Sequence, residues 1–169
     1  FEFFQNTQFN LTKPADFFTL NDEAFYGDYK AFSNLEIAKP NSESNLFYAI
    51  RIFQDLTRHQ QQLGNESGII ETTLKRLQFV NNQTNNPQKD KLYFDALTKL
   101  TEAYAENEET AGVWYEIALY HSGKGDHYNR TTGENQLEKK KAMEICNATI
   151  SKFPEFDLTI FLNKAVAMP

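Results

Sequence analysis

The segment AGVWYEIALYHSGKGDHYNR, residues 111–130, decides the fold of this chain. It contains the only tryptophan and two of the three histidines of the sequence. Its first half belongs to a predicted helix, residues 110–121, and its second half is polar, with glycine-lysine-glycine at residues 123–125. Two interpretations are open at this point. The segment is either an active-site loop or a helix of a repeat that continues into a polar loop.

Helical periodicity extends to both sides of this segment. Apolar residues recur at steps of three and four over residues 43–62, 66–82, 87–106 and 135–153, which is typical of helices with one buried face. The five prolines lie at or beyond the ends of these segments, as expected because proline breaks a helix interior. No stretch shows the sustained period of two that is typical of strands. The sequence therefore predicts an all-α fold.

Individual residues of these helices are assigned to ends and faces. We expect Gly64 to end the first helix, and Asn86 and Pro87 to begin the third as N-cap and first helical residue. Arg51 and Asp55 lie four residues apart and are expected to pair on the solvent side of the first helix. The predicted buried face of that helix consists of Leu46, Ala49, Ile50, Phe53 and Leu56.

The helices also resemble the two-helix tetratricopeptide repeat, which places a large aromatic residue and a small residue four positions apart in its first helix. Trp114 and Ala118 take these positions. The second helix of the unit offers small residues and a closing proline, at Ala142, Cys146, Thr149 and Pro154. A preceding half unit is formed by Ala96, Leu100 and Ala103, with Glu108 where the proline is expected. We predict an antiparallel helix-pair repeat that forms a right-handed, tetratricopeptide-like array.

Residues 122–135 are the predicted loop between the two helices of this unit, and they make it longer than the usual repeat turn. A phosphate-binding loop is excluded because Ala118 and Gly125 occupy positions that require glycine and a hydroxyl residue. His121, Asp126 and His127 carry metal-ligating groups, but their spacing does not place them on one face. We therefore expect no chemistry here, with His127 and Tyr128 holding the loop against the helices.

The first 40 residues carry eight of the fifteen phenylalanines. Such a load of large apolar side chains indicates a packed segment rather than a disordered tail. We predict short helices around residues 1–5, 14–19 and 28–32, and a last helix after Pro154. The predicted organisation is an irregular Phe-rich part, residues 1–40, which forms one structural unit with a tetratricopeptide-like helical domain, residues 41–169.

The net charge restricts the partners of the chain. A formal charge of -6 disfavours nucleic acid and anionic membrane surfaces, and no apolar run approaches the ~20 residues that span a bilayer. The one basic run, residues 139–141, is expected to lie on a solvated face, with Lys140 near Glu144 and Lys141 near Glu138. The lone Cys146 lies on an apolar stripe, where cysteine packs as a small apolar residue.

No catalytic, cofactor-binding or metal-binding residue is predicted. The sequence lacks a nucleophile elbow, a His-Glu-x-x-His motif, a dinucleotide fingerprint and a Cys-x-x-Cys pair. Glu106, Glu108 and Glu109 are clustered but are expected to be exposed, whereas acid–base catalysis uses carboxylates in pockets that shift their pKa. We therefore expect a protein that is not an enzyme and binds no cofactor.

Five segments, taken in order, carry a family resemblance: FYGDYKAFSNLEI, YAIRIFQDLTRHQ, TTLKRLQFV, DKLYFDALTKLTEAYAENEETAGVWYEIALYH and KKKAMEICNATISKFPE. They resemble the helical, tetratricopeptide-like region that precedes the macroglobulin β-sandwich domains in alpha-2-macroglobulin-like proteins of Bacteroidetes. The resemblance implies a lipid-anchored, periplasmic or cell-envelope parent protein that traps or inhibits proteases. The sequence ICNAT around Cys146 does not match the thioester motif of that family, so no functional residue is carried over.

Two functions follow as hypotheses. The resemblance implies a non-catalytic scaffold or protein-interaction domain, which packs against neighbouring macroglobulin β-domains of the same parent chain or against another protein. The alternative is a stand-alone tetratricopeptide module that binds peptides in a concave groove.

Overall fold

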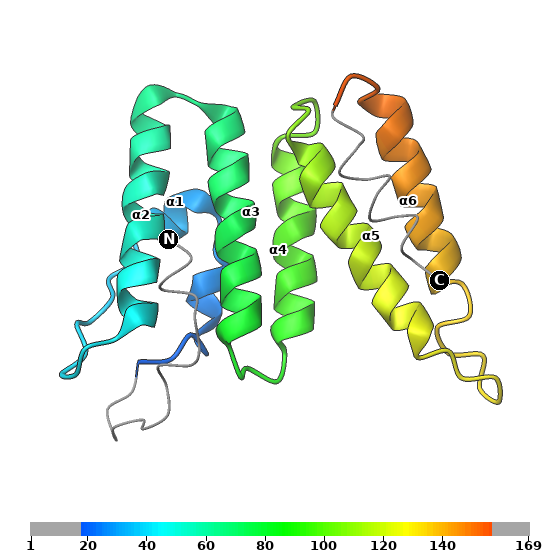
Figure 1. The fold of residues 1–169 in the computed structure, drawn as a ribbon, viewed down its shortest axis with the longest axis horizontal. Coiled ribbons are helices and arrows are strands. Elements are labelled where there is room, and N and C mark those ends of the chain that lie inside the picture. The colour runs from blue at the N-terminus through cyan, green and yellow to red at the C-terminus, as the bar shows by residue number, and fades with distance from the viewer. Residues whose placement is uncertain (1–17, 157–169) are drawn as a thin grey trace. The chain divides into compact units, whose positions relative to one another are not determined.

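The computed structural model describes residues 18–156, and all regular secondary structure in this part of the chain is helical, which confirms the predicted all-α class. Within these residues there is no strand (Figure 1). Residues 1–99 and residues 100–169 form two compact units. The division predicted at residue 40 falls within the first unit and stays a prediction. The described elements, in chain order, are the 3-10 helix η3 (Glu23–Tyr26) and the α-helices α1 (Tyr29–Ser33), α2 (Asn45–Leu63), α3 (Glu66–Gln83), α4 (Lys89–Ala103), α5 (Thr110–Asp126) and α6 (Glu138–Lys152).

Helices α2 and α3 form an antiparallel hairpin in the first unit, and both lie where the periodicity predicts them (Figure 1). Ser44 caps α2 by accepting a hydrogen bond from the backbone N–H of Phe47 at 3.3 Å. Gly64 ends α2 with φ of 61°, in the left-handed region that glycine adopts without strain. Asn65 then caps α3 by accepting from the N–H of Gly68. The tight turn between the two helices is therefore encoded locally.

The buried face of α2 is rotated relative to the prediction. Leu56 was expected to be buried, but 43% of its surface is exposed. Gln54 and Thr57 are buried instead, because residues preceding α2 fold back over this side of the helix. The expected pair of Arg51 with Asp55 is also wrong, since Asp55 pairs with Arg58 and Arg51 donates to Gln54. The four other predicted positions, Leu46, Ala49, Ile50 and Phe53, are buried.

We call residues 20–35, which comprise η3 and α1, the strap. The strap packs against the α2–α3 hairpin, as the contacts of α1 with α2 and of η3 with α3 show. Asp22 caps η3 and Asp28 caps α1 through their side chains, so each short helix has its own start signal. The helix predicted at residues 28–32 is confirmed as α1, whereas η3 was not predicted. Its four residues are too few to show a period.

Helix α4 begins two residues later than predicted. The Asn86 side chain accepts from the N–H of Gln88 at 2.8 Å, and the N–H of Lys89 donates to the Asn86 carbonyl. Pro87 therefore lies in a turn before the helix rather than in its first turn. The helix ends at Ala103, three residues before the predicted end at residue 106.

Helices α5 and α6 pack against each other in the second unit, around a small core of Ala111, Tyr115 and Phe153. Helix α5 was predicted to stop at residue 121 and extends to Asp126. The loop predicted at residues 122–135 therefore begins later, and residues 127–137 join the helices. The extension runs through two glycines, which disfavour helix. Contact with α6 outweighs that intrinsic preference.

Gly125 is the point at which this contact is closest. It is buried, and a Cβ atom placed on it would lie 2.5 Å from Cγ and 3.0 Å from the backbone nitrogen of Lys139. The end of α5 therefore reaches the beginning of α6 only because residue 125 has no side chain. Gly123, in the same turn, has no atom within 4 Å of its Cβ position.

Several predicted helices fall outside the described residues. These are the helix at residues 1–5, the first four residues of the helix at 14–19, and the helix after Pro154 from residue 157 onward. Phe18 and Thr19 have no regular structure, so the end of the second of these predictions is wrong.

The two glycines of α5 provide a matched test of the close approach. We expect Gly125→Ala to destabilise the protein by about 1–3 kcal/mol, because the new methyl group overlaps Lys139. Gly123→Ala should instead stabilise it by about 0.5–1 kcal/mol, since alanine favours helix and meets no neighbour. Urea unfolding followed by circular dichroism measures both values. A change of the same sign in both variants would contradict the packing role of Gly125.

Candidate functional site

The three residues that could have formed a metal site in the second unit do not come together. His121 lies within α5, Asp126 ends that helix and His127 follows it in an exposed position. Within residues 18–156 no group of three or more histidine, cysteine or acidic side chains is arranged to hold a metal ion. His127 and Tyr128 were also expected to hold the loop against the helices. Both are exposed, and that expectation stays a prediction.

His121 instead takes part in a polar contact that joins α5 to α6. Its Nδ1 lies 2.6 Å from Oε2 of Glu138, and Nζ of Lys141 lies 2.7 Å from Oε1 of the same carboxylate. Only 10% of the Glu138 side chain is exposed. The two hydrogen bonds from Lys141 and His121 lower the pKa of Glu138 to about 2, against the opposing effect of burial. This carboxylate is a structural anion with two partners.

A second ion pair, between Lys139 and Asp126 at 2.9 Å, lies at the same junction of α5 and α6. The basic run at residues 139–141 is exposed, and the expected pairs of Lys140 with Glu144 and of Lys141 with Glu138 are confirmed. Each lysine of the run is thus close to a carboxylate. Among the described residues, this neutralisation leaves no free basic patch at the start of α6.

The glutamate cluster and the cysteine of the second unit, which the sequence analysis considered, are exposed or partly buried. Glu106 is 89% exposed and pairs with Lys152 at 3.0 Å, and Glu108 is exposed too, whereas Glu109 is half-buried. Cys146 is half-buried, and burial raises the pKa of its thiol. A thiol with a raised pKa is a poorer nucleophile.

The described residues of α5 and α6 also line a hollow of about 140 Å³. Its wall is mainly apolar, with Lys152 as the only charged residue among those that line it in the described part of the chain. Trp114, the tryptophan of the predicted repeat, is half-buried and contributes to this wall. The lining residues are Trp114, Ile145, Ala148, Thr149, Lys152 and Phe153.

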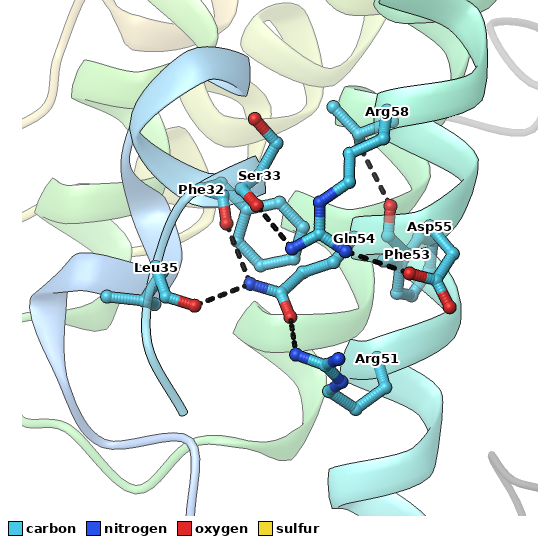
Figure 2. A network of polar contacts seen from close by, with 9 residues as sticks. Phe32, Ser33, Leu35, Arg51, Phe53, Gln54, Asp55 and Arg58 are labelled. Carbon is cyan, nitrogen blue, oxygen red and sulfur yellow. Dashed lines mark hydrogen bonds and ion pairs between the residues drawn. The ribbon is translucent and has the colours of Figure 1, made fainter. Parts of the chain in front are cut away.

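The most connected polar network lies in the first unit, where α2 holds the end of the strap. Figure 2 shows Gln54 between Arg51 and two carbonyl groups. Its amide nitrogen donates to the carbonyl oxygens of Phe32 at 2.9 Å and Leu35 at 2.8 Å, and its own oxygen accepts from Arg51. These carbonyls belong to the last turn of α1 and the residues after it. They lie too close to the end of so short a helix to accept its regular backbone bonds.

Arg58 extends this network by one turn of α2. Its Nη2 donates to the carbonyl of Ser33 at 2.6 Å, and its Nη1 pairs with Asp55 at 2.8 Å (Figure 2). Gln54 is fully buried, whereas Arg58 remains partly exposed. Both side chains bind main-chain groups of the strap. Sequence analysis missed this network because the buried face predicted from the apolar residues of α2 does not include Gln54.

Arg76 of α3 holds the middle of the strap. It is 1% exposed, its guanidinium lies over the Phe32 ring at 4.2 Å, and its Nη2 donates to the carbonyl of Gly27 at 2.7 Å. No described residue accepts a hydrogen bond from its Nε or Nη1. Burial lowers the pKa of Arg76 to about 9, and the charge of Asp28 opposes this shift. Arg76 is therefore a buried cation with unused donors.

Comparison of the chain with protein-family models, with curated proteins and with solved structures gives no match. Within the described residues, none of the helices combines the length and the apolar character required to cross a bilayer.

The role of Gln54 is tested by removing its amide. We expect Gln54→Leu to lower the free energy of unfolding by about 2–4 kcal/mol, because two strap carbonyls lose a buried donor. The control is Gln62→Leu at an exposed position of the same helix, for which a change within about 0.5 kcal/mol is expected. Urea unfolding followed by circular dichroism gives both values. Equal stability of the two variants would contradict this role of Gln54.

The paired state of Glu138 predicts an acid dependence of stability. Its pKa falls from the ordinary 4.5 to about 2 on folding, so its contribution is complete above pH 4.5 and is lost as pH falls toward 2. We expect Glu138→Gln to be less stable than the wild type at neutral pH and to lose less stability over this pH window. Glu134→Gln, in the preceding loop, controls for the loss of one charge. If the free energy of unfolding changes with pH equally in the wild type and in Glu138→Gln, the paired state of Glu138 is contradicted.

Proposed function

We propose that this chain is a non-catalytic helical scaffold, and that it serves as a protein-interaction domain of a larger alpha-2-macroglobulin-like protease inhibitor of the cell envelope. Its partners are then the neighbouring macroglobulin β-domains or another protein. The parent is periplasmic or anchored to the envelope, as the sequence resemblance implies.

One observation carries the non-catalytic part of the proposal. Three buried polar side chains of the described residues are engaged in joining helices, and they do not converge on the apolar hollow. Glu138 joins α5 to α6, and Gln54 and Arg76 join the strap to α2 and α3. Acid–base or nucleophilic catalysis requires such groups to face a substrate.

The tetratricopeptide-like arrangement is also part of the proposal. Helices α5 and α6 correspond to the two helices of the predicted repeat unit, and they pack on each other. Ala118 and Ala142, at the positions where the repeat requires small residues, are both buried, and so is Thr149. These features support a repeat unit with an extended connection between its helices.

A second candidate function is peptide binding by a tetratricopeptide module that acts on its own. The hollow beside Trp114 favours it, because apolar side chains around a half-buried tryptophan are suited to a large side chain of a ligand. In this alternative no macroglobulin domain is needed.

The coding sequence on both sides of residues 1–169 is the first test. A series of β-sandwich domains downstream is expected, and its absence would overturn the macroglobulin proposal in favour of the peptide-binding module. The downstream domains should then bind the chain in isothermal titration calorimetry. We expect Trp114→Ala to weaken this binding at least about tenfold, as for a central aromatic contact. Tyr128→Ala, which truncates an exposed aromatic residue of the loop, is the matched control.

A further inference from the structure

The α2–α3 hairpin holds the strap largely by its main chain, beside one side-chain bond in which the Tyr26 hydroxyl donates to Oδ1 of Asn81 at 3.2 Å. Four hydrogen bonds run from side-chain donors of the hairpin to strap carbonyl groups, and none of these four involves a strap side chain. They are Gln54 to Phe32, Gln54 to Leu35, Arg58 to Ser33 and Arg76 to Gly27, at 2.6–2.9 Å. Recognition of main-chain carbonyls is independent of the side chains that the bound segment carries. It is a general means by which a protein surface holds a peptide.

The strap also supplies apolar anchors, most of which precede these polar contacts in the chain. Leu20, Phe25, Tyr26 and Phe32 are all buried, with Phe32 and Leu20 completely so. The hairpin thus contacts the strap as a receptor contacts a peptide, with carbonyl groups fixed by amide and guanidinium donors and with large side chains buried as anchors. In this chain the bound segment is covalently attached through the residues that lead to α2.

Arg76 indicates which charge a ligand bound to α2 and α3 should carry. The buried guanidinium has one hydrogen bond to the strap and two nitrogens without a described acceptor. The acidic influence on it comes from the strap residue Asp28, whose carboxylate is occupied in capping α1. A buried cation is stabilised by an opposite charge. A ligand with an acidic residue at this position is therefore favoured over one without.

We propose that the face formed by α2 and α3 is a peptide-binding groove that the strap occupies in cis. The partner that competes with the strap is a peptide with aromatic anchors on both sides of an acidic residue, as in Phe25, Asp28 and Phe32 of the strap itself. Release of the strap is then the step that exposes the groove. This groove lies in the first unit, and its proposal does not depend on the hollow beside Trp114.

The test uses the full chain and a fluorescein-labelled peptide with the sequence of residues 18–36. The labelled peptide can bind only to molecules in which the strap has left the groove. The apparent affinity for the peptide is therefore reduced in proportion to the fraction of molecules in that open state. Phe32→Ala in the chain weakens only the cis strap, because the peptide keeps its phenylalanine. We expect this variant to bind the peptide at least about tenfold more tightly than the wild type in fluorescence anisotropy. Phe32→Leu, which removes less of the anchor, should show a smaller gain in the same direction and remain folded.

Two controls separate the groove from non-specific capture. Adding Gln54→Ala and Arg58→Ala to Phe32→Ala should abolish the gain, since the groove then lacks the donors of three of the four bonds to the peptide carbonyls. A peptide with Asp28→Asn should bind more weakly than the original, because asparagine still caps a helix but carries no charge for Arg76.

The results of these binding experiments distinguish the possible occupants of the groove. No gain in affinity for either Phe32 variant, with helical content retained in circular dichroism, would overturn the proposal. Equal binding of the original peptide and its Asp28→Asn form would remove the acidic preference and, with it, the stated partner. Self-association of Phe32→Ala that excess peptide does not reverse would assign the groove to the strap of a second copy instead.

Discussion

The structure of the first unit depends on how the carbonyl groups of one short helix find their donors. Helix α1 has five residues, so its last carbonyls have no N–H four residues further on within the helix. Gln54 and Arg58 of α2 supply donors to them, and Arg76 of α3 supplies one just before the helix. Without these donors, burial of Phe32 would leave carbonyl groups poorly paired beside the core, at a cost of about 1–3 kcal/mol for each that keeps no other donor. The Phe32 carbonyl would keep the backbone N–H of Leu35, 3.2 Å away. The side chains of the hairpin therefore determine whether the strap can be buried.

The sequence predicted what depends on local pattern. Periodicity placed α2 and α3 to within a few residues. Gly64 was expected to end α2, and it does so with a positive φ that glycine adopts readily because it has no side chain. Helix α5 was predicted too short because a glycine-containing stretch disfavours helix when considered alone. Its last turn is stabilised by α6, and the residues that do so are more than ten positions away in the sequence. A contact of that kind has no local signal.

The same reason explains why the polar network that holds the strap was missed. A buried glutamine and a buried arginine violate the pattern by which core positions are recognised, since such residues are usually exposed. Gln54 and Arg76 become interpretable only once the strap is known to lie over the helices. The carboxylate of Glu138 is a comparable case, because it can bond to His121 only when α5 and α6 lie close together. Buried polar residues that interrupt the apolar periodicity thus mark the positions where tertiary contacts, and not secondary structure alone, determine the fold.

The position of Trp114 has a spectroscopic consequence. As the only tryptophan of the chain, it gives the second unit an intrinsic optical probe, whereas the first unit has none that responds to selective excitation of indole. Far-ultraviolet circular dichroism, by contrast, records helices of both units. Two unfolding curves taken from the same sample therefore report different parts of one molecule, and their coincidence or separation measures whether the chain melts as one cooperative system.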